Sequence, residues 1–123
     1  MSSSKYQDVL DFWFKESSSK DHWVKNDQYD QKIRDRFLDD VEKAIRNEYD
    51  DWQDEAKSSL ALIILLDQFS RNLFRNDPKS YSQDTKARLL VTEGVDRQYL
   101  DELDTSEKFF YLLPLIHSED LQD

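Results

Sequence analysis

The segment of residues 60–75, LALIILLDQFSRNLFR, is the only long apolar run in the chain, and it ends in a dense group of polar residues. The chain around it is 36% charged. At helical spacing its first two turns are apolar on every face, which is typical of a helix surrounded by other helices. We therefore expect the rest of the chain to pack around this central helix.

The composition predicts an all-α fold in a single helical domain, residues 1–123. One glycine and two prolines leave few positions for tight turns with positive φ, which disfavours β-hairpins. Three Trp, six Tyr and seven Phe supply large apolar side chains for a core, although the hydrophobic fraction is only 37%. Trp23 is expected in a connecting segment, where it plugs the end of the core. Apolar periodicity predicts about five or six helices: one capped by residues 2–4 that carries residues 6–14, others at 27–47, 58–75, 82–93 and 106–113, and a last one that starts at Ser118.

Single residues are expected to mark the ends of these helices. Gly94 is predicted as the residue directly after the fourth helix, where glycine is common. Asp104 and Glu107 have the spacing of a capping box at the start of the fifth helix. Pro114 is expected to end that helix, and Ser118 is predicted to cap the sixth.

The charge distribution limits the classes of partner. A net charge of −10 argues against binding to nucleic acid or to anionic membrane surfaces, which both favour basic proteins. The first residues, MSSSKYQD, lack the apolar core of a signal peptide, and the chain has no cysteine. Only seven residues of the apolar run precede Asp67, whereas about 20 are needed to span a bilayer. The sequence therefore predicts a soluble, cytoplasmic protein that binds neither nucleic acid nor membrane.

The polar end of the central helix continues an apolar stripe that is expected to be buried. At 100° per residue the stripe consists of Leu60, Ile64, Asp67, Arg71 and Arg75, and Gln68 and Asn72 adjoin it. Because a buried charge without a partner is costly, we expect Asp67 and Arg71 to be partly buried and to form an ion pair at i, i+4 spacing.

Two interpretations of this polar end stay open. In the first, Asp67, Gln68, Arg71 and Asn72 hold neighbouring helices together through hydrogen bonds and salt bridges. In the second, Arg71, Asn72 and Arg75 hold an anionic ligand in a cleft, because the guanidinium fork suits carboxylate and phosphate groups. Residues 56–92 carry six basic and three acidic side chains, which favours the second interpretation weakly.

A further polar group follows Pro114, and it contains the candidate ligand-binding residues His117 and Glu119. Together with Asp67 it has the donor types of a carboxylate–imidazole metal site. The chain has no HExxH motif, however, and a helix start explains the acidic residues without a metal. We therefore predict no metal, no cofactor and no catalytic residue.

Four segments in order resemble the domain of unknown function 924 family. Residues 60–75 are similar to its LALILLLDQFPRNLFRG-type signature, with Ser70 where proline is usual, so that the helix is expected to run straighter there. Residues 9–14 are similar to its VLDFWF opening, residues 23–37 to its W-F-x-K-D-x-x-F-D-x-x-I-x-x-R-F stretch, and residues 113–120 to its LPLMHSED segment. The resemblance implies an all-α fold of the tetratricopeptide-like superfamily, built from antiparallel helix pairs.

Members of this family continue beyond the HSED segment, so the resemblance implies that the last helices of the family domain are absent from this chain. A homo-oligomer is then a possible arrangement, because a second copy would cover the helix face that those helices normally bury. The family has no established activity, and no catalytic residue follows from the resemblance.

Two functions remain as hypotheses. The first is a non-enzymatic interaction module that binds a protein segment or an anionic small ligand through the polar end of the central helix, an analogy that fold alone supports. The second is an enzyme of unknown reaction with a pocket built from Asp67, Arg71 and His117. An open pocket with His117 close to a carboxylate would favour the enzyme, and a polar end sealed by partner side chains would exclude it.

Overall fold

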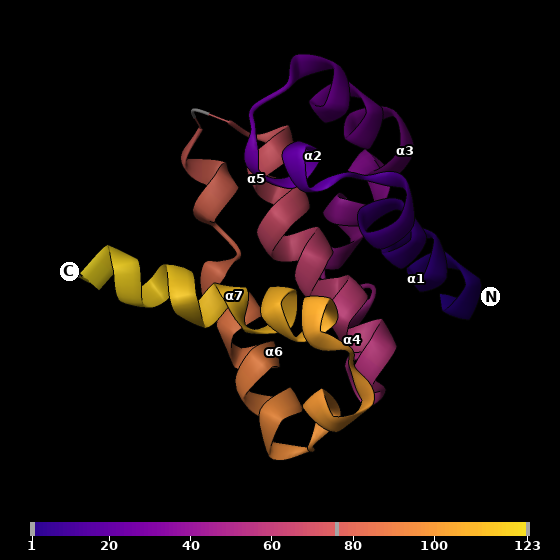
Figure 1. The fold of residues 1–123 in the computed structure, drawn as a ribbon, viewed down its shortest axis with the longest axis vertical. Helices are drawn as coiled ribbons and strands as arrows, with labels where there is room; N and C mark the ends of the chain where they lie inside the picture. The colour runs from indigo at the N-terminus through magenta and orange to yellow at the C-terminus, as the bar shows by residue number, and fades with distance from the viewer. Residues whose placement is uncertain (1, 76, 123) are drawn as a thin grey trace.

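The computed structural model describes residues 2–75 and 77–122, with side chains described at 5–75, 77–79 and 82–116 (Figure 1). Within these residues all regular structure is helical, which confirms the all-α prediction. Six continuous helices follow one another: α1 (Ser2–Asp11) with the π-helical turn η1 (Phe12–Glu16), α2 (Ser19–Trp23), α3 (Asp27–Ile45), α4 (Ala56–Ile63) joined to α5 (Ser70–Leu73) by the π-helical turn η3 (Ile64–Phe69), α6 (Asp84–Asp96) and α7 (Thr105–Gln122). Short 3-10 turns connect them at η2 (Asp50–Asp54), η4 (Pro78–Tyr81) and η5 (Tyr99–Glu102).

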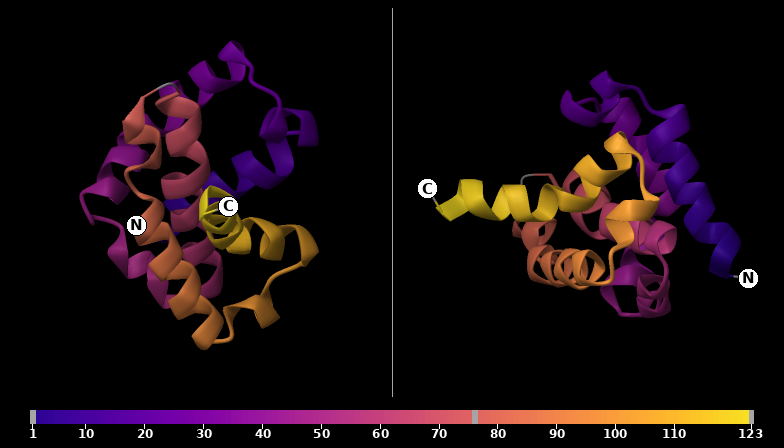
Figure 2. Two further views of the ribbon diagram at one scale, coloured as in Figure 1. Left: turned by 90° about the vertical axis from the view of Figure 1, so that its left-hand side faces the viewer. Right: turned by 60° about the horizontal axis from the view of Figure 1, so that its bottom comes forward.

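The predicted central helix is residues 56–73, which comprise α4, η3 and α5. Every side chain from Leu60 to Leu66 is fully buried. This helix contacts α1, α3, α6 and α7, and α7 runs across it (Figures 1 and 2). Burial of one large aliphatic side chain contributes about 1.5–3 kcal/mol, so the apolar run supplies much of the driving force for folding.

Helix α3 carries the regular apolar ladder that its sequence predicts. Tyr29, Ile33, Phe37 and Val41 are buried at i, i+4 spacing. Asn26 caps the helix and accepts hydrogen bonds from the backbone of residues 28 and 29. The ladder meets α1 and the central helix through aromatic contacts, because the rings of Phe12, Phe37 and Phe69 lie 5.2–5.9 Å apart.

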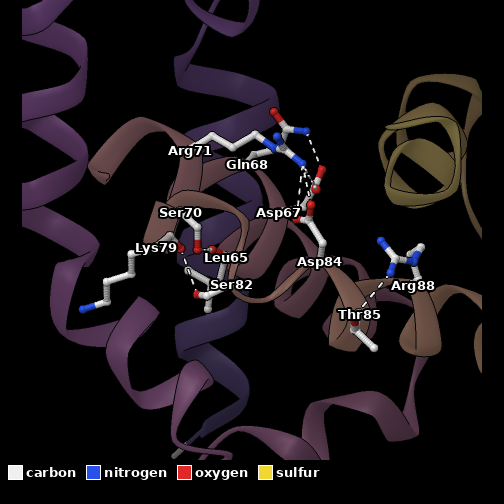
Figure 3. Close-up of polar contacts among 10 residues, drawn as sticks. All are labelled: Leu65, Asp67, Gln68, Ser70, Arg71, Lys79, Ser82, Asp84, Thr85 and Arg88. Carbon is white, nitrogen blue, oxygen red and sulfur yellow. Dashed lines mark hydrogen bonds and ion pairs between the residues drawn. The ribbon is translucent and has the colours of Figure 1, made fainter. Parts of the chain in front are cut away.

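Both π-helical turns are followed by a serine whose hydroxyl donates to the backbone carbonyl five residues earlier. In a π-helix the carbonyl accepts from the residue five positions later. Ser17 donates both its backbone N–H (3.0 Å) and its hydroxyl (2.7 Å) to the carbonyl of Phe12. The hydroxyl of Ser70 donates to the carbonyl of Leu65 at 3.3 Å (Figure 3). The chain stays helical at Ser70, directly after a π-helical turn, and the expected straighter course of the helix stays a prediction.

The predicted helix ends near Gly94 and Pro114 are wrong. Helix α6 continues to Asp96, and Gly94 lies buried inside it against α7. Helix α7 runs through Pro114 to Gln122, so Ser118 lies inside a helix instead of capping one. An internal proline costs one backbone hydrogen bond, and the burial of Tyr111, Leu113 and Pro114 holds this segment in helical geometry. The predicted capping box of Asp104 and Glu107 is confirmed, with hydrogen bonds of 2.8 and 3.0 Å.

Trp23 also differs from its predicted environment. It is the last residue of the short helix α2, which the sequence did not predict, and its side chain is 55% exposed. Within the described residues, no helix combines the length and the apolar composition that a membrane crossing requires. The tetratricopeptide-like arrangement of helix pairs stays a prediction.

Candidate functional site

The polar end of the central helix is joined to α6 by a shared guanidinium (Figure 3). Asp67 is only 1% exposed and accepts hydrogen bonds from Gln68 Nε2 at 2.8 Å and from Arg71 Nη2 at 3.3 Å. Arg71 Nη2 also lies 3.2 Å from Asp84 Oδ1 on α6. The predicted Asp67–Arg71 ion pair is confirmed, and its arginine also binds a second carboxylate from a neighbouring helix.

The remaining polar residues of this segment bind α3. Asn72 Nδ2 donates to Asp30 Oδ1 at 2.8 Å, and Arg75 Nε donates to Asp30 Oδ2 at 2.6 Å. Arg34 on α3 donates to the carbonyl of Leu73 at 2.7 Å. Helix α5 ends at Leu73, so Arg75 leaves the stripe that constant helical spacing predicts for it and faces α3.

These contacts favour the structural interpretation of the polar end. Arg71 binds Asp67 and Asp84, whereas Arg75 binds Asp30, so the two guanidinium groups do not converge on one cleft. Sequence reasoning missed both Asp30 and Asp84. Asp30 belongs to a face of α3 whose charged residues look solvated in the sequence. Both acids lie outside residues 60–75, the segment from which the polar site was predicted. The side chains of His117 and Glu119 lie outside the described residues.

A different surface, which we call the aromatic groove, lies between α2 and the start of α7. It has a volume of about 610 Å³ and is lined by the rings of Phe14, His22, Trp23, Phe109 and Phe110. Hydroxyl-bearing residues complete the lining: Ser17, Ser19, Thr105 and Ser106. None of these described lining residues carries a carboxylate, ammonium or guanidinium group, which is unusual in a chain that is 36% charged.

Aromatic contacts fix the walls of the groove while leaving ring surface open to solvent. Trp23 stacks on Phe110 with the ring centroids 5.8 Å apart and contacts Phe109 edge to face at 5.9 Å. Phe109 is nevertheless 43% exposed. Adjacent residues of a helix lie about 100° apart around its axis, and here Phe110 is buried whereas Phe109 is turned outward. The sequence pattern did not mark Phe109 as exposed, and it predicted Trp23 in a connecting segment that plugs the end of the core.

His22 is the polar residue that connects the groove to the core. Its ring stacks on Trp13 at 4.0 Å, and its Nε2 lies 2.8 Å from the backbone carbonyl of Trp13. That carbonyl is available because it lies in the last turn of η1, and the backbone N–H of Ser18, five residues later, donates to Asp21 instead. Burial lowers the pKa of His22 below its usual value, against the opposing effects of the Trp13 carbonyl and of Asp21.

Within the described residues, no group of three or more His, Cys, Asp or Glu side chains is placed to hold a metal ion. Two polar contacts support the walls of the groove. Tyr29 binds the hydroxyl of Ser17 at 2.7 Å, and burial raises the pKa of Tyr29 to about 12. Lys57 on α4 binds both carboxylate oxygens of Glu107, at 2.8 and 2.7 Å, which fixes the first turn of α7.

Comparison with known proteins identifies relatives without a known function. The family model described as "Bacterial protein of unknown function (DUF924)" matches residues 9–123. The solved structure of a protein of unknown function from Agrobacterium tumefaciens, ATU0120, is similar with a TM-score of 0.88 and 35% sequence identity. The match covers 93% of this chain and 64% of that chain, so this chain spans less than two thirds of the length of that structure. No curated protein matches the chain.

Proposed function

The chain belongs to the DUF924 family of bacterial proteins of unknown function, and we propose that it is an interaction module that binds a protein segment in the aromatic groove. The observation that carries this proposal is the pair of exposed rings in the groove, Trp23 at 55% and Phe109 at 43%. Large aromatic side chains dominate the binding energy of protein interfaces, and their contact with water is unfavourable. An occupant that covers both rings would be stabilised by this apolar burial.

The lining of the groove also limits the chemistry of its occupant. Because none of the described lining residues carries a carboxylate, ammonium or guanidinium group, a charged group inside the groove would lose its hydration without gaining a counter-charge from them. The segment that binds is therefore expected to place an uncharged aromatic side chain between Trp23 and Phe109. With both rings this open to solvent, the groove suits a side chain on an extended or helical segment better than a ligand that must be fully enclosed.

In our proposal the polar end of the central helix does not bind the partner but holds α6 and α3 against the central helix. Its arginines already bind carboxylates of the same chain, which offset the positive charge that would attract an anionic ligand. The proposal thus keeps the predicted class of function, a binding module, and moves its site from Arg71 and Arg75 to Trp23 and Phe109. Cytoplasmic location stays a prediction from the sequence.

The test is a selection of random peptides on the purified chain, followed by affinity measurements on three variants. Trp23→Ala and Phe109→Ala remove the exposed rings, and both should fold because neither side chain is buried. Leu89→Ala is the matched control, since Leu89 is 60% exposed on α6, outside the groove. We expect the selected peptides to share an aromatic residue, to bind both groove variants about tenfold more weakly, and to bind Leu89→Ala like the wild type. Peptides that bind all three variants equally would contradict the proposal.

A further inference from the structure

The hydrogen bond between His22 and Trp13 fixes the tautomer of the imidazole ring. A backbone carbonyl can only accept a hydrogen bond, so Nε2 of His22 must carry the proton that it donates to the Trp13 oxygen at 2.8 Å. In the neutral ring, Nδ1 then has no proton and is an acceptor. The stacking of His22 on Trp13 holds the ring in this orientation.

Nδ1 of His22 is open to an incoming donor. No described residue donates a hydrogen bond to Nδ1 of His22. Among the described residues, Nδ1 is not one of the buried side-chain atoms without a hydrogen-bond partner, such as Trp13 Nε1 and Trp52 Nε1. Nδ1 of His22 is therefore in contact with solvent. His22 lines the aromatic groove, and the other described lining residues are aromatic or hydroxyl-bearing. We infer that the solvent-exposed Nδ1 of His22 faces this groove.

We propose that the aromatic groove selects a tryptophan or tyrosine side chain of the bound segment, whose ring N–H or O–H donates to Nδ1 of His22. This inference rests on the proposed function of the groove and specifies the anchor residue. Both rings present an apolar face for Trp23, Phe109 and Phe110 together with one donor at the ring edge. A phenylalanine has the same kind of face but leaves the His22 acceptor without a partner once water is excluded.

The experiment compares three peptides by ¹⁵N-edited NMR titration of the whole chain: acetyl-Gly-Trp-Gly-amide, the same peptide with 1-methyltryptophan, and the same peptide with phenylalanine. The methyl group removes the indole donor and adds one carbon, whereas the phenylalanine peptide lacks the donor without that added bulk. We expect the tryptophan peptide to bind about fivefold more tightly than the other two, the size of effect expected for one hydrogen bond. Its binding should also shift the Nδ1 resonance of His22, which the methylated peptide should leave in place.

A variant separates the two nitrogens of His22. In His22→Gln the side-chain amide can still donate to the Trp13 carbonyl, but nothing replaces the acceptor at Nδ1. We expect this variant to bind the tryptophan and 1-methyltryptophan peptides equally, whereas Phe109→Ala should weaken both. Equal binding of all three peptides to the wild type would overturn the choice of anchor and leave the groove function standing. Groove resonances that shift with protein concentration alone would show a second copy in the groove and overturn both proposals.

Discussion

Gly94 on α6 and Tyr111 on α7 approach so closely that a Cβ atom at position 94 would overlap the hydroxyl end of the tyrosine ring. Tyr111 is fully buried, and its hydroxyl lies 2.9 Å from Ser59 Oγ on α4 and 3.4 Å from the carbonyl of Leu90. Three helices therefore meet at a contact that requires glycine for space, and the φ angle of Gly94 is not positive.

Gly94→Ala should lower the free energy of unfolding by about 2 kcal/mol, because the tyrosine ring must shift in a close-packed core. Helix propensity alone predicts the opposite sign, since alanine is the better helix former by roughly 0.5–1 kcal/mol. Urea denaturation distinguishes the two. Tyr111→Leu is the background control, in which the cost of the same substitution should fall because the hydroxyl and ring edge are gone. A stabilising Gly94→Ala would contradict the close approach.

Asp67→Ala should lower the free energy of unfolding by about 3 kcal/mol, because it leaves a partly buried arginine with one carboxylate fewer. Asp39→Ala is the matched control. Asp39 and Lys43 form the same i, i+4 pair at the exposed surface of α3, where such pairs contribute less than about 1 kcal/mol. Thermal and urea denaturation of both variants should show the difference. Equal losses would mean that burial of Asp67 has no energetic consequence.

Glu107 should show a graded response, because it has two roles. It closes the capping box with Asp104 and binds Lys57 with both oxygens. Glu107→Gln keeps a side chain that can complete the box but loses the charge that pairs with Lys57, so we expect a loss of about 1 kcal/mol. Glu107→Ala removes both interactions and should cost about 2 kcal/mol. Lys57→Ala in the Gln variant should then add little, which urea denaturation can measure.

Stability should fall when the pH drops below the ordinary pKa of histidine, 6.5. Burial lowers the pKa of His22 in the folded state, so the unfolded state binds a proton first as the pH decreases through 6.5. By linkage, proton uptake by the unfolded state lowers the free energy of unfolding until the folded state is protonated too. The full contribution is present above pH 6.5.

The measurement is urea denaturation at a series of pH values from about 7.5 down to 5.5, above the range in which ordinary carboxylates titrate. His22→Gln does not titrate there and can still donate to the Trp13 carbonyl, so its stability should change less over the same range. A wild-type chain whose stability rises between pH 7 and 6 would contradict the lowered pKa of His22.

The all-α class, the central helix and the ladder of α3 could be predicted from the sequence, because they depend on periodic apolar residues. The ion pair of Asp67 and Arg71 also followed from helical spacing, since its partners lie on one helix. The ends at Gly94 and Pro114 were wrong for one reason. Local preferences favour a helix end at both residues, but burial of their neighbours against other helices outweighs these preferences.

The positions of long-range partners were decided only by the tertiary structure. Asp84 and Asp30 meet Arg71 and Arg75 because α6 and α3 pack beside the central helix, and no local pattern marks an acid for such a pairing. Trp23 and Phe109 become neighbours across 86 positions of the chain. The sequence by itself determined most of the helical segments and their apolar faces, because these depend on neighbours within a turn. Packing decided which polar groups are satisfied internally and which aromatic rings remain exposed, because both depend on residues far apart in the chain.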